Sequence, residues 1–173
     1  MRTSDSSSSA PTERELRLAA EWMRVARLIS ASIQSRIDFD PDKVDDPLVR
    51  YAPLKLLLND AYVRELHKWG DRESANKLRD IQRQKYTQLL SHLATEARRH
   101  QRRRLDHMDR AESWNSYGEV FRQAWFVRLV IARLRAALWL YTVSLPGAAW
   151  LASDACKNLR RLFPPAQVIP IRA

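Results

Sequence analysis

Glycine is scarce in this sequence, and its scarcity narrows the classes of fold and function. The 173 residues include only three glycines, at positions 70, 118 and 147, far from one another. Gly-rich phosphate loops and tight β-hairpin turns need backbone with positive φ or backbone that closely approaches a ligand, and glycine normally supplies both. We therefore expect neither a nucleotide-binding loop nor a β-rich fold.

Cysteine is almost absent as well. Cys156 is the only one, so the chain can form neither an internal disulfide nor a metal site of several thiolates. Two interpretations of Cys156 stay open. The neighbouring Lys157 and Arg160 could lower the pKa of its thiol and make it reactive, whereas a lone cysteine in an apolar segment is usually a packing residue.

Acidic residues are outnumbered by basic ones. Twenty Asp and Glu stand against thirty Lys and Arg, which gives a net charge of +10, and 45% of the chain is apolar. Such an excess indicates an anionic partner, which could be nucleic acid, anionic lipid or an acidic protein surface. The apolar fraction is ordinary for a folded protein rather than a disordered one.

Apolar residues recur at helical spacing over most of the chain and predict an all-α protein. Residues 1–12 form a polar tail with no apolar stretch of a secretory signal peptide. An amphipathic helical region follows at 13–112, with a first helix from about Glu13 to Ser35 behind a Thr12-x-x-Glu15 capping box. Its acidic loop, 37–47, contains five aspartates and two prolines.

The largest predicted element is a helix of about forty residues, from Asp71 to about Ala111, without proline or glycine. A helical region at 113–163 and a tail at 164–173 complete the chain. The fold class that we expect is an extended all-α protein with one long central helix and a C-terminal helix that spans or lies on a membrane.

The longest uncharged stretch, residues 136–153, supports that membrane prediction. Its eighteen residues meet the lower limit for a transmembrane helix. The preceding stretch, 120–134, is apolar but contains arginines, which suits an interfacial helix leading into the span. The alternative is a helical hairpin that turns at Pro146-Gly147 and buries its apolar residues within the protein.

Side chains of two kinds are predicted to meet the membrane or a partner. The amphipathic indole rings of tryptophan favour the membrane interface, and we assign this role to Trp125, Trp139 and Trp150. Basic side chains can reach anionic headgroups, cardiolipin among them, or acidic partners. The basic set comprises Arg98, Arg99, Arg102, Arg103, Arg104, Arg128, Arg133, Arg135, Lys157, Arg160 and Arg161.

The densest part of this basic set, residues 98–110, has three interpretations. It could contact lipid headgroups or acidic protein, it could contact an RNA backbone, or it could be a solvated helix face. No aromatic residue lies within the run, so a base-stacking platform is missing there. Nucleic acid is therefore the less favoured partner.

No residue pattern predicts catalysis or a metal site. His92, Glu96 and His100 share a helix face, but the two histidines are eight residues apart, about 12 Å along the axis and too far for one ion. The acidic loop lacks the glycine and the terminal glutamate of a calcium-binding EF-hand loop, so we expect it to dock onto arginines. We predict no cofactor.

These observations favour a non-catalytic accessory subunit of a large membrane complex. A mitochondrial energy-transducing complex, such as a respiratory complex or ATP synthase of the inner membrane, is the expected setting, because such complexes contain many small basic subunits. The partners would be other subunits and membrane lipid. Two alternatives stay open: an RNA-associated subunit such as an organellar ribosomal protein, and a soluble helical adaptor.

Overall fold

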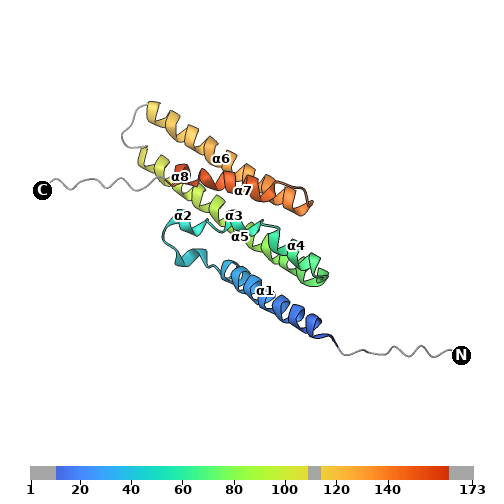
Figure 1. Cartoon of the computed structure of the whole chain (residues 1–173). Coiled ribbons are helices and arrows are strands. Elements are labelled where there is room, and N and C mark those ends of the chain that lie inside the picture. The colour runs from blue at the N-terminus through green and yellow to red at the C-terminus, as the bar shows by residue number, and fades with distance from the viewer. Residues whose placement is uncertain (1–10, 109–113, 164–173) are drawn as a thin grey trace. The chain divides into compact units, whose positions relative to one another are not determined.

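The computed structural model describes residues 11–108 and 114–163, and within these ranges every regular element is a helix (Figure 1). The all-α prediction is therefore confirmed for the described residues. Of the predicted tails, 1–12 and 164–173, only residues 11 and 12 are described. The elements follow in this order: α1 (Glu13–Ile37), the 3-10 helix η1 (Pro41–Lys43), α2 (Pro47–Arg50), α3 (Leu54–Leu57), α4 (Ala61–Lys68), α5 (Arg72–Met108), α6 (Trp114–Thr142), α7 (Ala148–Lys157) and α8 (Leu159–Leu162).

Helix α1 belongs to the first of two compact units, residues 1–36 and 37–173. It begins with the predicted capping box, in which the backbone N–H of Thr12 donates to Oε2 of Glu15 at 2.7 Å. None of its side chains is buried, and Leu18 of its predicted apolar stripe is 56% exposed. The helical spacing of the apolar residues thus predicted the helix, but these residues are not buried in α1.

The short helices of the second unit begin and end where aspartate, proline and glycine dictate. Oδ1 of Asp46 accepts from the backbone N–H of Leu48 at 2.8 Å, and Pro47 occupies the first position of α2. After α4, Gly70 adopts a φ of +80°, which stops the helix. Oδ1 of Asp71 then caps α5 by accepting from the backbone N–H of Ser74 at 2.9 Å.

Helix α5 is the predicted long helix. Its 37 residues extend over about 55 Å at 1.5 Å per residue. The helix is described as far as Met108, and the expected end near Ala111 lies outside the described residues. It packs against α3, α4 and α6, so its apolar seam serves the core of the second unit.

Residues 136–153 do not form one helix. Helix α6 ends at Thr142, and α7 begins at Ala148 after a turn that contains Pro146 and Gly147. Gly147 has a φ of +94°, a left-handed conformation that helps to reverse the chain direction. Helix α7 packs back along α6 (Figure 1).

Residues 136–153 therefore form two helices and a turn instead of the single continuous helix that we expected, and the helical hairpin that turns at Pro146-Gly147 describes this part of the fold. The physical reason is local, because proline lacks the N–H that would continue the helical hydrogen bonds. Within the described ranges, no helix combines the length and the apolar character needed to cross a bilayer.

The core of the second unit lies between α3, α5, α6 and α7. Leucines of α3 and aromatic residues of α5 and α6 are fully enclosed there. Two buried hydrogen bonds join α5 to α6: Tyr86 Oη donates to the carbonyl of Leu134 at 2.9 Å, and Tyr141 Oη donates to Oε1 of Gln82 at 2.7 Å. These bonds fix which face of α6 turns inward and so which face remains outside.

Candidate functional site

The outer face of α6 carries an apolar stripe that the described residues of the second unit leave uncovered. Its members recur every three or four residues, so they lie above one another on one side of the helix. They are Phe121, Trp125, Leu129, Ala132, Ala136, Trp139 and, just past the helix end, Val143. Phe121, Trp125 and Trp139 are 67%, 68% and 60% exposed. We call these seven residues the α6 stripe.

Arginines border the α6 stripe on both sides. Arg128 and Arg135 lie two turns apart on the edge nearest α5, and Arg122 and Arg133 lie on the opposite edge. Arg133 pairs with Asp154 of α7, with 3.4 Å between Nη1 and Oδ2. No acidic residue occurs in the sequence between positions 121 and 142. The stripe therefore combines an apolar centre with a positively charged border.

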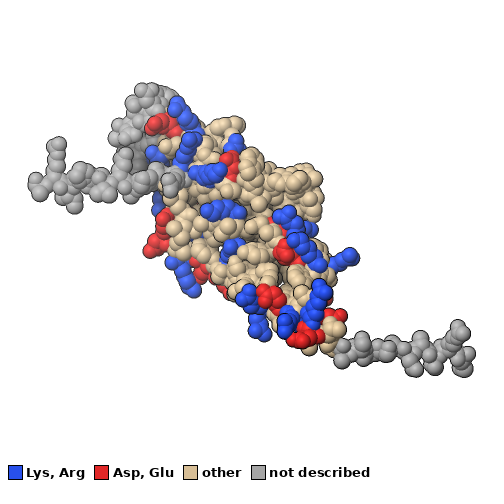
Figure 2. Space-filling model, in the orientation of Figure 1, with Lys and Arg blue, Asp and Glu red and all other residues tan. Residues whose placement is uncertain are grey.

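The three tryptophans predicted to lie at an interface are all exposed. Trp150 of α7 is 70% exposed, more than Trp125 or Trp139 of α6. In the space-filling view, charged side chains are sparse where α6 ends and turns into α7 (Figure 2). The hairpin thus buries Leu134, Ala137 and Ala152 but leaves its tryptophans outside, so only part of the buried-hairpin alternative holds.

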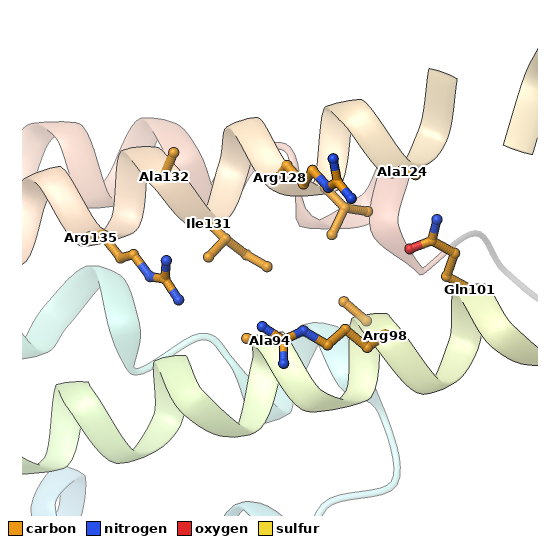
Figure 3. A pocket seen from close by; sticks show the side chains of 10 residues that line it. Ala94, Arg98, Gln101, Ala124, Arg128, Ile131, Ala132 and Arg135 are labelled. Carbon is orange, nitrogen blue, oxygen red and sulfur yellow. The ribbon is translucent and has the colours of Figure 1, made fainter. Parts of the chain in front are cut away.

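A groove of about 470 Å³ separates α5 from α6 next to the stripe. Alanines line much of it, and their small side chains leave the space open. Three arginines line it as well: Arg98 from α5, and Arg128 and Arg135 from α6. The close view shows Gln101 extending from α5 towards α6, Arg135 extending from α6 towards α5, and Arg98 lying along α5 towards Ala94 (Figure 3). No lining residue is acidic.

A smaller hollow of about 30 Å³ continues the groove towards α8. His100, Arg104 and Arg161 line it. Arg104 donates to the side chain of Gln123 across the helix pair, and the guanidinium of Arg161 lies 5.3 Å from the centre of the Phe126 ring. Partial burial, with smaller contributions from Arg104 and Arg103, lowers the pKa of His100.

The predicted basic residues therefore occupy several different surfaces. Arg98, Arg128 and Arg135 meet at the groove, whereas Arg99, Arg102 and Arg103 are exposed elsewhere along α5. Lys157 is exposed on α7. The side chain of Arg160 and the whole of Arg110 lie outside the described residues. Sequence spacing alone could not separate these groups, since only the packing of α5 on α6 brings three of them together.

The face of α5 that contains His92 and Glu96 binds the segment of chain before it. Glu96 accepts hydrogen bonds from both Arg50 and the buried hydroxyl of Tyr51. The Tyr51 hydroxyl is also 3.0 Å from Nδ1 of His92, and Nε2 of His92 lies 3.2 Å from Oδ1 of Asp42. Burial and the adjoining Glu96 raise the pKa of Tyr51 far above its usual range.

This polar network anchors the acidic loop, and it differs in part from the docking that the sequence predicts. Asp42 docks onto His92, a histidine of the same unit. The expected contact with an arginine is also present, because Nε of Arg50, which pairs with Glu96, donates to the backbone carbonyl of Val44 in the loop at 2.8 Å. His100 takes no part in the network. Among the described residues, no group of three or more histidine, cysteine or acidic side chains is arranged to hold a metal ion.

Cys156 lies in a different environment from the one that its basic neighbours suggested. It is half-buried against the core, and burial raises the pKa of its thiol to about 11, although Lys55 acts in the opposite direction. The shift is opposite in direction to the lowered pKa that a reactive thiolate needs, and it favours the packing interpretation. Cys156 is a packing residue.

The chain was compared with protein families, curated proteins and solved structures. No family model, no curated protein and no solved structure matches the chain. The features of the molecule that indicate a function are therefore the α6 stripe and the groove beside it.

Proposed function

We propose that this protein is a helical accessory protein that attaches to an anionic membrane surface through the α6 stripe. The observation that carries the proposal is the row of exposed aromatic residues between two borders of arginine. Interfacial helices have this composition, with Trp, Phe and Leu on the apolar face and basic residues beside it. From Phe121 to Val143 the stripe extends over about 33 Å, long enough to lie along the bilayer plane.

Charge argues for a lipid surface over a second copy of the chain. In a symmetric dimer through the α6 stripe, each copy would bring its own arginine borders against those of its partner, and like charges that meet at an interface are costly. Anionic headgroups would neutralise these arginines instead, with about 1 kcal/mol for each basic residue near the surface.

The aliphatic members of the stripe argue for lipid over RNA. Bases stack on aromatic rings, but Leu129, Ala132 and Ala136 separate the rings of Trp125 and Trp139 along the helix. Aliphatic side chains gain free energy by leaving water for an apolar phase, which the outer acyl region of a bilayer provides. A protein partner with an acidic border is the alternative occupant of the stripe, and the experiment distinguishes it from lipid.

An accessory role in a membrane complex is consistent with this mode of attachment. A bundle held on one face by lipid leaves α4, α5 and α7 to contact neighbouring subunits. A non-catalytic role and a mitochondrial energy-transducing complex stay our predictions for the activity and the setting.

The test is flotation of the purified full chain with vesicles of neutral phosphatidylcholine, with and without anionic phospholipid. The double variant W125Q/W139Q removes the two largest rings of the α6 stripe, and W69Q removes a tryptophan that is 45% exposed just past the end of α4. We expect the double variant to lower partition into anionic vesicles by at least about tenfold, because burial of an aromatic ring contributes on the order of 1.5–3 kcal/mol. W69Q should bind like the wild type.

A second measurement places the rings in the lipid. Vesicles with bromine in their acyl chains should quench the tryptophan fluorescence of the wild type more than that of W125Q/W139Q. Equal partition and equal quenching of both proteins would contradict the proposal. Stable capture of a protein partner by the wild type but not by W125Q/W139Q, without any flotation, would assign the stripe to that partner.

A further inference from the structure

The groove between α5 and α6 gathers three arginines around a space with no carboxylate. Arg98, Arg128 and Arg135 line it, together with Gln101 and several alanines (Figure 3). Within the described part of the chain, none of these arginines forms an ion pair, whereas Arg133, two residues before Arg135 and on the other edge of the stripe, pairs with Asp154. The groove arginines thus have no carboxylate counterion among the residues that the structure describes.

Three guanidinium groups around one space repel one another unless an anion joins them. Guanidinium is planar and donates two parallel hydrogen bonds to the oxygens of a phosphate, which makes arginine well suited to bind that group. Gln101 adds an amide that can donate a further hydrogen bond. The site therefore favours a phosphate group over a simple chloride ion.

The position of the groove connects it with the α6 stripe. Ala132 belongs both to the stripe and to the lining of the groove, and Arg128 and Arg135 form the shared edge. A phosphate in the groove would therefore lie beside the acyl chains that contact Trp125 and Trp139. An anionic phospholipid places its phosphate and its acyl chains next to each other in this way.

We infer that Arg98, Arg128 and Arg135 form a binding site for the headgroup phosphate of an anionic phospholipid at the edge of the α6 stripe. This inference rests on the proposed membrane attachment and adds a specific lipid contact to it. The arginines bind the phosphate through paired hydrogen bonds, and the alanines leave room for the headgroup. Attachment through the stripe alone would need only diffuse positive charge.

Two triple variants separate a specific site from diffuse charge. R98K/R128K/R135K keeps every positive charge but removes the paired hydrogen-bond geometry of guanidinium. R72K/R99K/R103K makes the same chemical change at three exposed arginines of α5 that do not line the groove. All six positions are exposed, so circular dichroism should show the wild-type fold for both variants.

The measurement is partition of these full-length proteins into vesicles of phosphatidylcholine with anionic phospholipid. We expect the groove variant to bind at least about fivefold more weakly than the wild type, and R72K/R99K/R103K to bind like the wild type. Equal binding of all three proteins would overturn the inference, because lysine would then serve as well as arginine. Equal losses in both variants would overturn it too.

A further arm distinguishes the lipid from free phosphate. Calorimetric titration with inorganic phosphate, without vesicles, should detect no binding to the groove at concentrations that leave vesicle binding intact. Tight binding of inorganic phosphate that R98K/R128K/R135K abolishes would instead identify a free-phosphate site and overturn the lipid assignment. If the attachment itself is wrong, the wild type fails to float or W125Q/W139Q floats equally well, a result distinct from equal binding of the lysine variants.

Discussion

Two buried tyrosines show how single residues determine which face of α6 is exposed. Both donate a hydrogen bond across the interface between α5 and α6, but their acceptors differ. Tyr86 donates to the backbone carbonyl of Leu134, which as a mid-helix group also accepts a bond within α6. Tyr141 donates to the side chain of Gln82, which is only 4% exposed and belongs to the core. Removal of either hydroxyl should therefore lower the free energy of unfolding by a different amount.

We predict that Y141F destabilises the protein more than Y86F. Y141F leaves the amide oxygen of Gln82 buried without its donor, which costs on the order of 1–3 kcal/mol. Y86F removes one bond from a carbonyl that keeps another, and about 0.5–1.5 kcal/mol is expected. Chemical denaturation followed by circular dichroism measures both values. The reverse order would contradict the role given to Gln82.

The α6–α7 hairpin determines which residues of the apolar C-terminal segment are buried and which are exposed. The turn after α6 contains two residues with positive φ, Ser144 at +57° and Gly147 at +94°. Arg79 of α5 reaches this turn and donates to Oγ of Ser144 at 3.2 Å. The reversal at this turn allows α7 to cover the inner face of α6 and leaves the α6 stripe outside.

Substitution of two glycines by alanine should change the free energy of unfolding in opposite directions, and only the change at Gly147 tests the turn. At Gly147, φ lies in the left-handed region, so G147A is strained by roughly 1–2 kcal/mol even though nothing lies within 4 Å of an added Cβ. Gly118 is helical and equally open, so G118A should stabilise the protein by up to about 1 kcal/mol. Thermal unfolding of both variants gives the comparison. A stabilising G147A would show that the turn is not left-handed.

At the scale of the whole molecule, the groups that burial perturbs most strongly are weak acids kept neutral. Burial raises the pKa of Tyr141 to about 12 and that of Cys156 to about 11. Burial also raises the pKa values of Tyr51 and Tyr86 well above their usual range. All four belong to the second unit, so its stability should depend on pH on the alkaline side.

The sign follows from the pKa difference between the folded and unfolded chain. In the unfolded chain, cysteine ionises near pH 8.5 and tyrosine near pH 10, whereas these groups stay protonated to higher pH in the folded chain. Their contribution to stability is fully present below the unfolded pKa and is lost as pH rises through the folded pKa. We therefore expect the free energy of unfolding to fall above about pH 9, by roughly 1.4 kcal/mol per pH unit for each tyrosine that ionises only on unfolding.

Denaturant titrations from about pH 7 to about pH 11 test this expectation. In Y141F the decline above the usual tyrosine pKa should be shallower than in the wild type, because one of the titrating groups is absent. A free energy of unfolding that stays constant up to about pH 11, or a decline that Y141F leaves unchanged, would be the contrary result.

The sequence by itself determined the helices and many of their ends. Apolar residues at a spacing of three and four, the Thr12–Glu15 box and the aspartate–proline cap of α2 are local signals, and local physics is enough to interpret them. The exposure of the three predicted tryptophans also agrees with their amphipathic character. The sequence did not determine which apolar surfaces pack in the protein core and which stay exposed.

Only the tertiary structure decided which apolar surfaces are buried. An uncharged stretch of eighteen residues gains free energy equally from lipid and from a protein core, so its composition does not distinguish the two. The reversal at Gly147 buries one side of the stretch on α3 and α6, and leaves Trp139 and Trp150 outside. Packing of α5 on α6 likewise selects Arg98, Arg128 and Arg135 from a long list of arginines, because a groove forms only where two helices meet.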